Sequence, residues 1–504
     1  MTRRHSMIAV SAGLGAALML AACAVGPSYR PAEAVPAGTQ VGTANSPPAT
    51  RAFFDSLAAA RAVDTLAPGD SARGGRVAAP APVVLRADQA GDLAWLDLLR
   101  DSTLVRYVRT ALEQNRDLRT AAARIREYRA LVGVARGPLF PSLSANGSAS
   151  TNKIALAGTP PVTYDAFRVT GDVAWELDFW GRIRRGIQAA GADLGAQEAA
   201  QRAVVLSLVS DVATSYLQLL ELDQERSIAE QTVESRQATL RLARRRFAQG
   251  LISELDVRQF EAQVSAPAAT LAQVERLRAE TSHQLDVLLG RTPVEVPRDT
   301  ANALTLAVAA LSVPDSLPGT LISRRPDVQQ AERELAAATA RIGVAQAARL
   351  PTITVVGSYG SQAGSTDGLF KANGEVYQLQ GGISFPLFTG GRLLNQSRAA
   401  VARADQARSQ YEQTALNALR EAGDALVGAR AARDEVAAQQ TQAQALRRAT
   451  QLAELRYRTG VASYVEVLQA QRDLFAAELA LSQAQLRQLT AAVGLYRALG
   501  GSWR

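Results

Sequence analysis

Residues 167–179 read FRVTGDVAWELDF, and apolar side chains occupy almost every second position of this stretch. The odd positions run from Phe167 through Trp175 to Phe179, whereas the even positions are mostly charged or polar. Strict alternation with a period of two predicts a β-strand with one apolar and one polar face. In a soluble sandwich the apolar face would pack on a second sheet. In a membrane barrel it would face lipid, and the polar face would line water.

The same pattern returns later in the chain. Alternation recurs from Tyr377 to Leu387, and two further strands are predicted near Leu143–Ala149 and Ile353–Tyr359. Compared with itself at a shift of 210 residues, the sequence aligns without a gap, matching Gly181 with Gly391, Gly250 with Gly460, and Leu289-Gly290 with Leu499-Gly500. We therefore predict two copies of one unit, residues 91–297 and 298–504, each containing a helix, two strands and a long helical hairpin.

Long proline-free segments set the scale of the predicted hairpins. Residues Arg182–Gln249 contain no proline and are rich in alanine, and the copy at Arg392–Thr459 is similar. At roughly 1.5 Å per residue each helix would be about 100 Å long, so we expect these helices to form a coiled-coil-like wall. After the leader, no stretch approaches the roughly 20 apolar residues of a membrane helix, so any span must use strands. Four strands are too few to close a barrel, so several chains must share it.

The first residues indicate export and lipid attachment. Basic residues precede an apolar run from Met7 to Ala22, which predicts a signal peptide over residues 1–22. The run ends on Leu-Ala-Ala-Cys23, the order that lipoprotein signal peptidase requires, and Cys23 is the only cysteine in the chain. A stray free thiol is the alternative to a lipid anchor. Ala24 follows the cysteine, and in lipoproteins generally this permits sorting to the outer membrane. We expect residues 23–90 to be a lipid-anchored linker.

Both predicted hairpins turn in the same way. Gly250 and Gly460 stand where a left-handed residue would end the long helix. Ser253 with Asp256, and Ser463 with Glu466, then form Ser-x-x-acid capping boxes. The two carboxylates could serve only as caps, or they could also form charged rings at the narrow end of a tube and select cations or help gating. Both interpretations are compatible.

One residue distinguishes the two returning helices. Pro267 interrupts the first of them, whereas the second carries Ala477 at the matching position. We expect a kink at Pro267.

Other classes of protein fit less well. The chain has 2 histidines, lacks zinc-ligand spacing and a nucleophile elbow, and shows no residues that we assign as catalytic or metal-binding. A net charge of +8 without basic runs interleaved with aromatics gives no reason to expect nucleic-acid binding. A lipid-anchored coiled-coil tether would explain Cys23 and the helices, but not strands with one apolar and one polar face.

Several motifs together resemble the outer-membrane efflux protein family, the TolC-like channels, and most closely its lipoprotein branch serving resistance-nodulation-division pumps. They are Cys23–Pro31 (CAVGPSYRP), Trp175–Arg182 (WELDFWGR), Arg324–Asp327 (RRPD), Phe385–Arg392 (FPLFTGGR) and Leu499–Gly501 (LGG). The resemblance implies a mixed α+β membrane protein that forms a homotrimer, with a 12-stranded outer-membrane barrel continued by a periplasmic 12-helix tunnel. It also implies docking on a periplasmic adaptor (membrane fusion) protein and an inner-membrane pump, and export of drugs or other small molecules.

The resemblance also suggests site residues. Tyr457 matches a family tyrosine that hydrogen-bonds a carboxylate at the position of Asp256, and Glu466 matches an acidic ring residue, so these three form the expected periplasmic gate. Ala462 and Gln469 depart from a gate arginine and a second aspartate found in some members. The adaptor would contact the hairpin tips at Gly250, Leu251, Ser253, Gly460, Val461 and Ser463. No cofactor is expected beyond the diacylglycerol and N-acyl lipid on Cys23.

Overall fold

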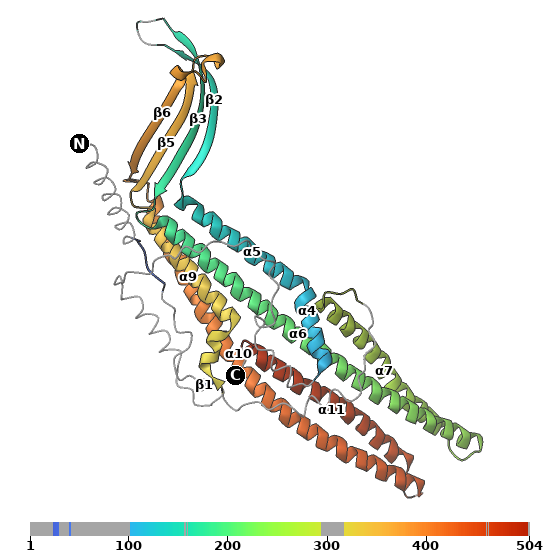
Figure 1. The fold of residues 1–504 in the computed structure, drawn as a ribbon. Helices are drawn as coiled ribbons and strands as arrows, with labels where there is room; N and C mark the ends of the chain where they lie inside the picture. The colour runs from blue at the N-terminus through green and yellow to red at the C-terminus, as the bar shows by residue number, and fades with distance from the viewer. Residues whose placement is uncertain are drawn as a thin grey trace.

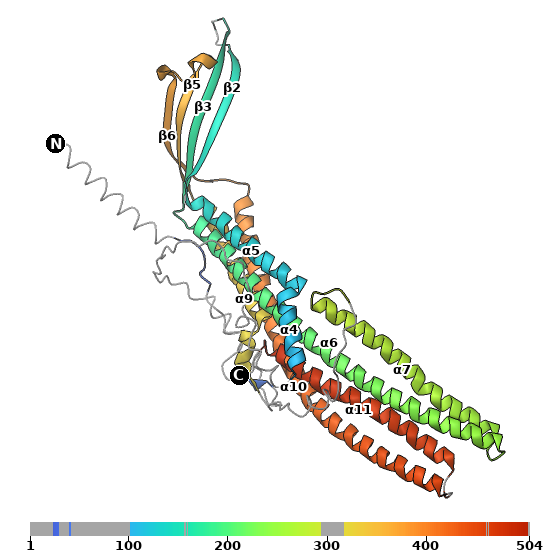
Figure 2. The same cartoon turned by 45° about the vertical axis from the view of Figure 1, so that its right-hand side comes forward.

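The molecule is elongated, with a β-sheet at one end and long helical hairpins at the other (Figure 1). The computed structural model describes residues 24–29, 40–41, 101–155, 158, 160–293, 317–459, 461 and 463–501. The predicted signal peptide, Cys23 and most of the predicted linker lie outside these residues. Turning the molecule shows that the strands stay together at one end and that the helices extend away from them (Figure 2).

The chain alternates between the sheet end and the hairpin end. The described elements are β1 (Gln40–Val41), α4 (Ser102–Gln114), α5 (Arg116–Arg136), η2 (Gly137–Leu139), β2 (Ser142–Ile154), β3 (Val162–Leu177), α6 (Arg182–Ala248), α7 (Glu254–Leu288), β4 (Leu317–Pro318), η3 (Gly319–Arg324), α9 (Pro326–Ala347), β5 (Thr352–Ala363), η4 (Thr366–Gly368), η5 (Ala372–Gly374), β6 (Glu375–Ser384), α10 (Arg392–Arg458) and α11 (Tyr464–Ala498).

The internal repeat is present in the backbone with the predicted shift. Helices α6 and α10 each contain 67 residues, α7 and α11 each contain 35, and corresponding helices begin 210 residues apart. Gly181 and Gly391, which precede the long helices, have φ angles of 77° and 78°. Residues other than glycine rarely adopt this left-handed conformation. The turn that leads into the long helix therefore has the same conformation in both repeats.

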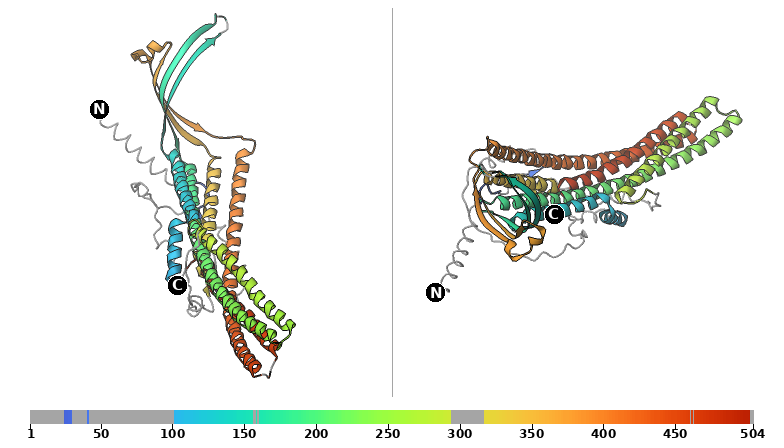
Figure 3. Two further views of the ribbon diagram at one scale, coloured as in Figure 1. Left: turned by 90° about the vertical axis from the view of Figure 1, so that its right-hand side faces the viewer. Right: turned by 90° about the horizontal axis from the view of Figure 1, so that it is seen from above.

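The main sheet has the order β2-β3-β5-β6, and every neighbouring pair is antiparallel. Seen from above, the sheet is curved and the hairpins extend away from it (Figure 3). All four predicted strands are present. The last one ends at Ser384 rather than Leu387, because Pro386 lacks the N–H that a ladder requires. Similarly, β3 ends at Leu177 rather than Phe179.

The single helix predicted at the start of the first unit is wrong in one respect, since the chain forms two helices, α4 and α5, divided at Asn115. The Asn115 side chain accepts hydrogen bonds from the backbone N–H groups of Asp117 (2.8 Å) and Leu118 (3.2 Å). Asparagine caps a new helix readily because its short amide competes for backbone groups, and here it begins α5 in a new direction.

The long helices form the core of the wall. By length and apolarity α6 could cross a membrane, but 61% of its most apolar window is buried inside the protein, as in a core helix. One apolar cluster joins α4, α6, α7 and α11, and includes Val212, Tyr216 and Leu489. A second cluster joins α9, α10 and α11 around Tyr411.

Shorter helices are joined end to end to extend the wall, and the two joints are equivalent in the repeat. In the first, the Asn115 side-chain amide donates to the Leu288 carbonyl at the end of α7 (3.0 Å). In the second, Arg325 stands at the matching position and donates to the Ala498 carbonyl at the end of α11 (2.9 Å). Each joint therefore caps a helix end with a side chain from the helix that follows it in space.

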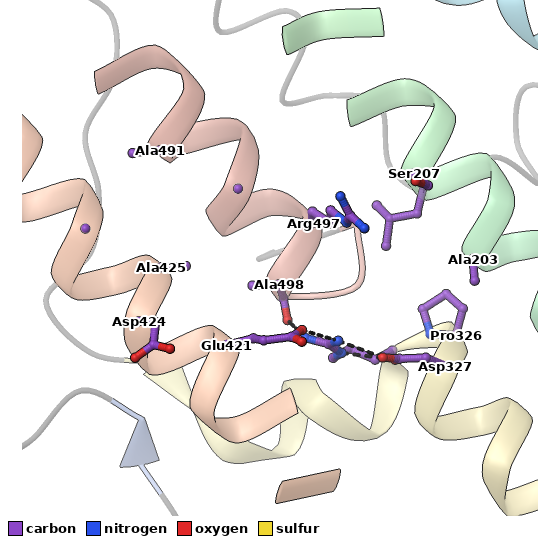
Figure 4. Close-up of a pocket in the computed structure, with 14 residues that line it drawn as sticks. Ala203, Ser207, Pro326, Asp327, Glu421, Asp424, Ala425, Ala491, Arg497 and Ala498 are labelled. Carbon is purple, nitrogen blue, oxygen red and sulfur yellow. Dashed lines mark hydrogen bonds and ion pairs between the residues drawn. The ribbon is translucent and has the colours of Figure 1, made fainter. Parts of the chain in front are cut away.

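Arg325 also binds two carboxylates, which makes the second joint a charged network. Its guanidinium contacts Asp327 and Glu421, each at 2.7 Å, so that α9, α10 and α11 converge on one side chain (Figure 4). Burial opposes its charge, but the bonds to Asp327 and Glu421 outweigh burial, and the pKa of Arg325 lies above its usual value. The network borders a cavity of about 550 Å³ that is lined by small residues and by charged side chains.

Replacing Arg325 with alanine is expected to lower the free energy of unfolding by about 2 kcal/mol, the order for losing hydrogen bonds to charged groups at a buried site. Thermal or denaturant unfolding of the purified protein measures this change. The matched control is Arg324→Ala, because Arg324 is the exposed neighbour. Equal effects of the two substitutions would show that the joint contributes nothing specific.

Candidate functional site

The sheet has one apolar and one polar face, as the alternation predicts. The register places Gly171 of β3 opposite Tyr359 of β5, and Tyr359 opposite Tyr377 of β6. The apolar face therefore carries Leu143, Val169, Val173, Trp175, Tyr359, Tyr377, Leu379 and Ile383. The opposite face carries Ser144, Asn146, Arg168, Thr170, Asp172, Gln378 and Gln380. Apolar side chains such as Leu379, 81% exposed, have no partner layer within the described part of the chain. Such a face suits lipid, and the polar face suits water.

Each outer strand of the sheet is hydrogen-bonded on one side only among the described residues. β2 pairs with β3 and β6 pairs with β5, which leaves a row of backbone donors and acceptors on each outer edge. In lipid such edges are not tolerated, because no water is available to pair them.

A tight corner joins the sheet to the long helix. The Asp178 carboxylate accepts hydrogen bonds from the backbone N–H groups of Ile183 (2.9 Å) and Arg184 (2.8 Å), and so caps α6. The Trp180 ring donates to the Pro351 carbonyl (2.7 Å), which links this corner to the start of β5. The family-like motif at residues 175–182 therefore has a structural explanation.

The segment that follows Cys23 is held against this corner. The Val25 N–H donates to the Trp180 carbonyl (3.0 Å), and Arg185 donates to the Gly26 carbonyl (2.8 Å). A side chain at Gly181 would lie 2.9 Å from the Cβ of Ala24, so glycine is needed for this approach as well as for the turn. Cys23 itself is outside the described residues, but its neighbour Ala24 lies at the boundary between sheet and helices.

The first hairpin tip matches the sequence prediction. Gly250 has a φ angle of 73° and ends α6, and Ser253 and Asp256 form the predicted capping box at the start of α7. The Ser253 hydroxyl and its backbone N–H bind the Asp256 carboxylate at 2.7 Å and 2.9 Å, and these bonds hold the pKa of Asp256 below its usual value.

The second tip differs from the prediction. Ser463 occupies the N-cap of α11 but makes no side-chain capping bond, so the second predicted capping box is wrong. The Glu466 carboxylate instead pairs with Arg456 at the end of α10 (3.2 Å). Competition from this arginine draws the carboxylate away from the cap. Gly460 and Ala462 lie outside the described residues.

The expected bond between Asp256 and Tyr457 is also absent. The partners of Asp256 lie within its own cap, and the Tyr457 hydroxyl instead accepts a hydrogen bond from Arg246 of α6 (3.0 Å). Phe260, Tyr457 and Tyr464 form a tip aromatic cluster beside it, with ring centroids 4.2 Å and 5.1 Å apart. The first and second hairpins are therefore joined near their tips by an arginine–tyrosine bond and by aromatic rings in tilted contact.

The tips also expose apolar side chains. Gly250, Leu251 and Ser253 lie in the first turn, and Val461 and Ser463 lie in the second. Leu251, Leu255, Val461 and Val465 are between 62% and 70% exposed. Apolar residues grouped at the end of a rod are typical of a protein-binding surface.

Comparison with known proteins agrees with this geometry. The family described as "Outer membrane efflux protein" matches residues 107–291 and 317–501. The solvent efflux pump outer membrane protein SrpC of Pseudomonas putida is 37% identical over 415 residues, which cover 81% of this chain and 87% of SrpC.

The chain belongs to the outer membrane efflux protein family.

Solved structures give the same result. The outer-membrane channel OprN has a TM-score of 0.74 and 32% identity, and the alignment covers 86% of this chain and 99% of OprN. CusC has a TM-score of 0.78 and 27% identity, covering 95% and 100%. This efflux protein is therefore an outer-membrane channel component of a tripartite efflux system, with its helices in the periplasm. Members of the family are channel proteins rather than enzymes.

The efflux protein contains a buried acidic pair that the sequence analysis missed. Glu221 and Glu225 lie one turn apart on α6 and are 4% and 7% exposed. They face α11, the helix of the second hairpin that packs on α6, and we call this α6–α11 contact the hairpin seam. Gln483 of α11 donates to Glu225 (2.9 Å). The sequence does contain a sign of this pair, because the two acids lie four residues apart on an otherwise apolar helix face.

The acidic pair retains a proton at neutral pH. Burial, and then the charge of Glu225, raises the pKa of Glu221 to about 8, and Arg487 of α11 only partly offsets this. Arg487 is itself held by Glu435 of α10 (2.7 Å). On the other side of α6, Arg278 of α7 pairs with Asp223 (2.6 Å).

The stability of the folded efflux protein should therefore depend on this proton. The folded state holds it up to about pH 8, whereas the unfolded chain releases it near pH 4.5. The contribution of Glu221 to the free energy of unfolding is thus complete below about pH 4.5. It is lost as the pH rises to about 8, and the free energy falls by at most about 1.4 kcal/mol per pH unit. Between these pH values, the unfolding midpoint should fall with rising pH less steeply in the Glu221→Gln variant than in the unmodified protein.

An exposed acid provides the control for this measurement. Glu280 pairs with Arg276 on the surface of α7, and Glu280→Gln should leave the pH profile unchanged. A Glu221→Gln profile as steep as that of the unmodified protein would show that Glu221 does not hold the proton.

Proposed function

We propose that three copies of this chain close one twelve-stranded barrel in the outer membrane. The observation that carries the proposal is the four-stranded sheet, which has an exposed apolar face and two outer edges that no described residue pairs. Joining β2 of one copy to β6 of the next removes both edges, and a closed ring is the only sheet arrangement that lipid accepts. Three sheets of four strands give a barrel with room for a water-filled lumen, whereas a single sheet cannot close. The polar face with Arg168 and Asp172 would line this lumen.

The helices would continue the lumen as a periplasmic tunnel. Each 67-residue helix is about 100 Å long at roughly 1.5 Å per residue. The end-to-end joints at Asn115 and Arg325 extend the shorter helices beside the long ones, which supports a continuous wall. Drugs or other small molecules would pass through without chemical change.

The hairpin tips would hold the gate and the docking surface for the rest of the pump. The exposed apolar tip residues support contact with a periplasmic adaptor that joins an inner-membrane pump of the resistance-nodulation-division class. Adaptor binding would stabilise a state in which the hairpins separate. Asp256 and Glu466 lie near the tips, and in a closed ring of three chains they would form acidic rings that favour cations.

The amino-terminal segment supports a lipid anchor at Cys23. Val25 and Gly26 are bound to the corner between sheet and helices, where the surface of the membrane would lie. A diacylglycerol on the preceding cysteine could enter the bilayer there without strain on the chain.

Replacing Cys23 with serine is expected to abolish incorporation of labelled palmitate in cells, because the thiol is the acceptor of the lipid. Labelling followed by purification measures this. Ala24→Gly, which leaves the thiol in place, serves as the control. Palmitate on the Cys23→Ser protein would place the lipid elsewhere.

Single-channel recording in planar bilayers tests the gate. We expect small, cation-selective openings from the purified lipidated protein. Tyr457→Phe should raise the resting conductance severalfold, because it removes the acceptor of Arg246 while it preserves the ring.

Asp256→Asn should leave that resting conductance nearly unchanged, because the Asp256 carboxylate is bonded within its own cap. If Asp256→Asn opened the pore and Tyr457→Phe did not, the latch would lie at Asp256. A folded outer-membrane protein that never conducts would favour the tether.

A further inference from the structure

Pro267 leaves one carbonyl of α7 without its helical partner. The helix continues through Pro267, which is buried in the middle of it. Proline has no N–H, so the carbonyl of Gln263, four residues earlier, cannot accept the usual backbone bond. A carbonyl in this position requires a donor from outside the helix.

The missing donor is the side chain of Arg236 on α6. Its guanidinium donates to the Gln263 carbonyl at 2.8 Å, and the residue is 6% exposed. The same guanidinium reaches across the hairpin seam to α11. There it makes a longer contact of 3.5 Å with the Gln471 carbonyl and lies 5.5 Å from the centre of the Phe475 ring. One arginine therefore contacts both hairpins.

The second repeat lacks both members of this arrangement. At the shift of 210 residues, Arg236 corresponds to Leu446 and Pro267 corresponds to Ala477. Helices α10 and α11 have the same lengths as α6 and α7, so neither Arg236 nor Pro267 is needed to build a hairpin. Their joint presence in the first repeat alone indicates a task other than folding.

We propose that Arg236 and Pro267 form a latch across the hairpin seam, in which the carbonyl freed by Pro267 positions Arg236 to hold α11 in the closed tunnel. The proposal rests on the proposed function, since it concerns the gate of the same channel. Arg236 would position α11, and the narrowest part of the tunnel would still be the proposed gate at the tips. The latch lies above the tip aromatic cluster on the same two hairpins.

The electrostatics of Arg236 make the latch reversible. Among the described residues no carboxylate forms an ion pair with Arg236, and burial lowers its pKa below the usual value. Two backbone carbonyls and the face of the Phe475 ring contact the guanidinium, and the nearby Tyr464 opposes the effect of burial only in part. When the hairpins separate, water would solvate the guanidinium, and this gain would offset part of the lost contact. An apolar seam would offer no such compensation.

A double-mutant cycle tests the latch on the full lipidated protein. The variants are Arg236→Met, Pro267→Ala and the combination, with Arg241→Met as the control at an exposed arginine of the same helix. The first measurement is amide hydrogen exchange in the Gln471–Phe475 turn of α11, and the second is resting conductance.

We expect Arg236→Met to accelerate exchange in that turn of α11 by roughly tenfold, the order for losing a hydrogen bond from a charged group. Pro267→Ala should act in the same direction on α11, although it restores a backbone bond in α7 and protects α7 itself. The combination should be no worse than Arg236→Met alone, because both changes remove one latch. Arg236→Lys should retain part of the protection, and Arg241→Met all of it. Resting conductance should rise in parallel.

Two results would overturn the proposal. One is unchanged amide exchange in α11 of the Pro267→Ala variant. The other is strictly additive effects of the two substitutions on that exchange. If Arg236→Met does not fold, Pro267→Ala and Arg236→Lys still decide the question. If the unmodified protein never conducts, the channel proposal fails, but the exchange cycle still shows whether Arg236 and Pro267 are coupled.

Discussion

The unpaired outer edges of the sheet are the constraint on which the rest of the structure depends. β2 and β6 present backbone donors and acceptors beside an apolar face, and lipid cannot satisfy such groups. The closure through other copies that we propose would therefore follow from hydrogen bonding rather than from any specific side chain. It would set a circular plan for the sheet, and the corners at Gly181 and Gly391 join the sheet to the helices. In the proposed trimer the helical wall would follow the same ring.

The two repeats build the wall from helices of the same lengths, and they differ at the residues of the proposed latch. The two halves share helix lengths, glycine corners and end-to-end joints, although Asn115 makes one joint and Arg325 makes the other. The hairpin seam between α6 and α11 contains the Glu221–Glu225 pair and Arg236, and nearer the tips the Arg246–Tyr457 bond joins α6 to α10. Water can replace these polar contacts when the hairpins separate, which would suit the opening that we propose.

Much of this architecture can be predicted from the sequence, because it depends on local rules. Alternation over residues 167–179 predicts the strand and its faces, and proline-free segments between glycines predict helices of nearly the right length. The failures concern competition between distant residues. Asn115 divides a helix because its amide also reaches Leu288, and Glu466 leaves its cap for Arg456. Arg246 belongs to a run of three arginines, and no sequence pattern shows which one meets Tyr457. Pro267 can be recognised in the sequence, but its effect cannot be predicted from it, because the carbonyl that it frees is bound by Arg236 of another helix.

Cross-linking between the outer strands tests the central claim most directly. Ser144 of β2 and Gln378 or Gln380 of β6 lie on the polar face, so cysteines at these positions would face the same lumen. Oxidation in the outer membrane, followed by denaturing electrophoresis, should give covalent dimers and trimers and nothing larger, because the third link closes the ring. A ladder that continues beyond three chains, or no linkage at any register, would contradict closure by three copies.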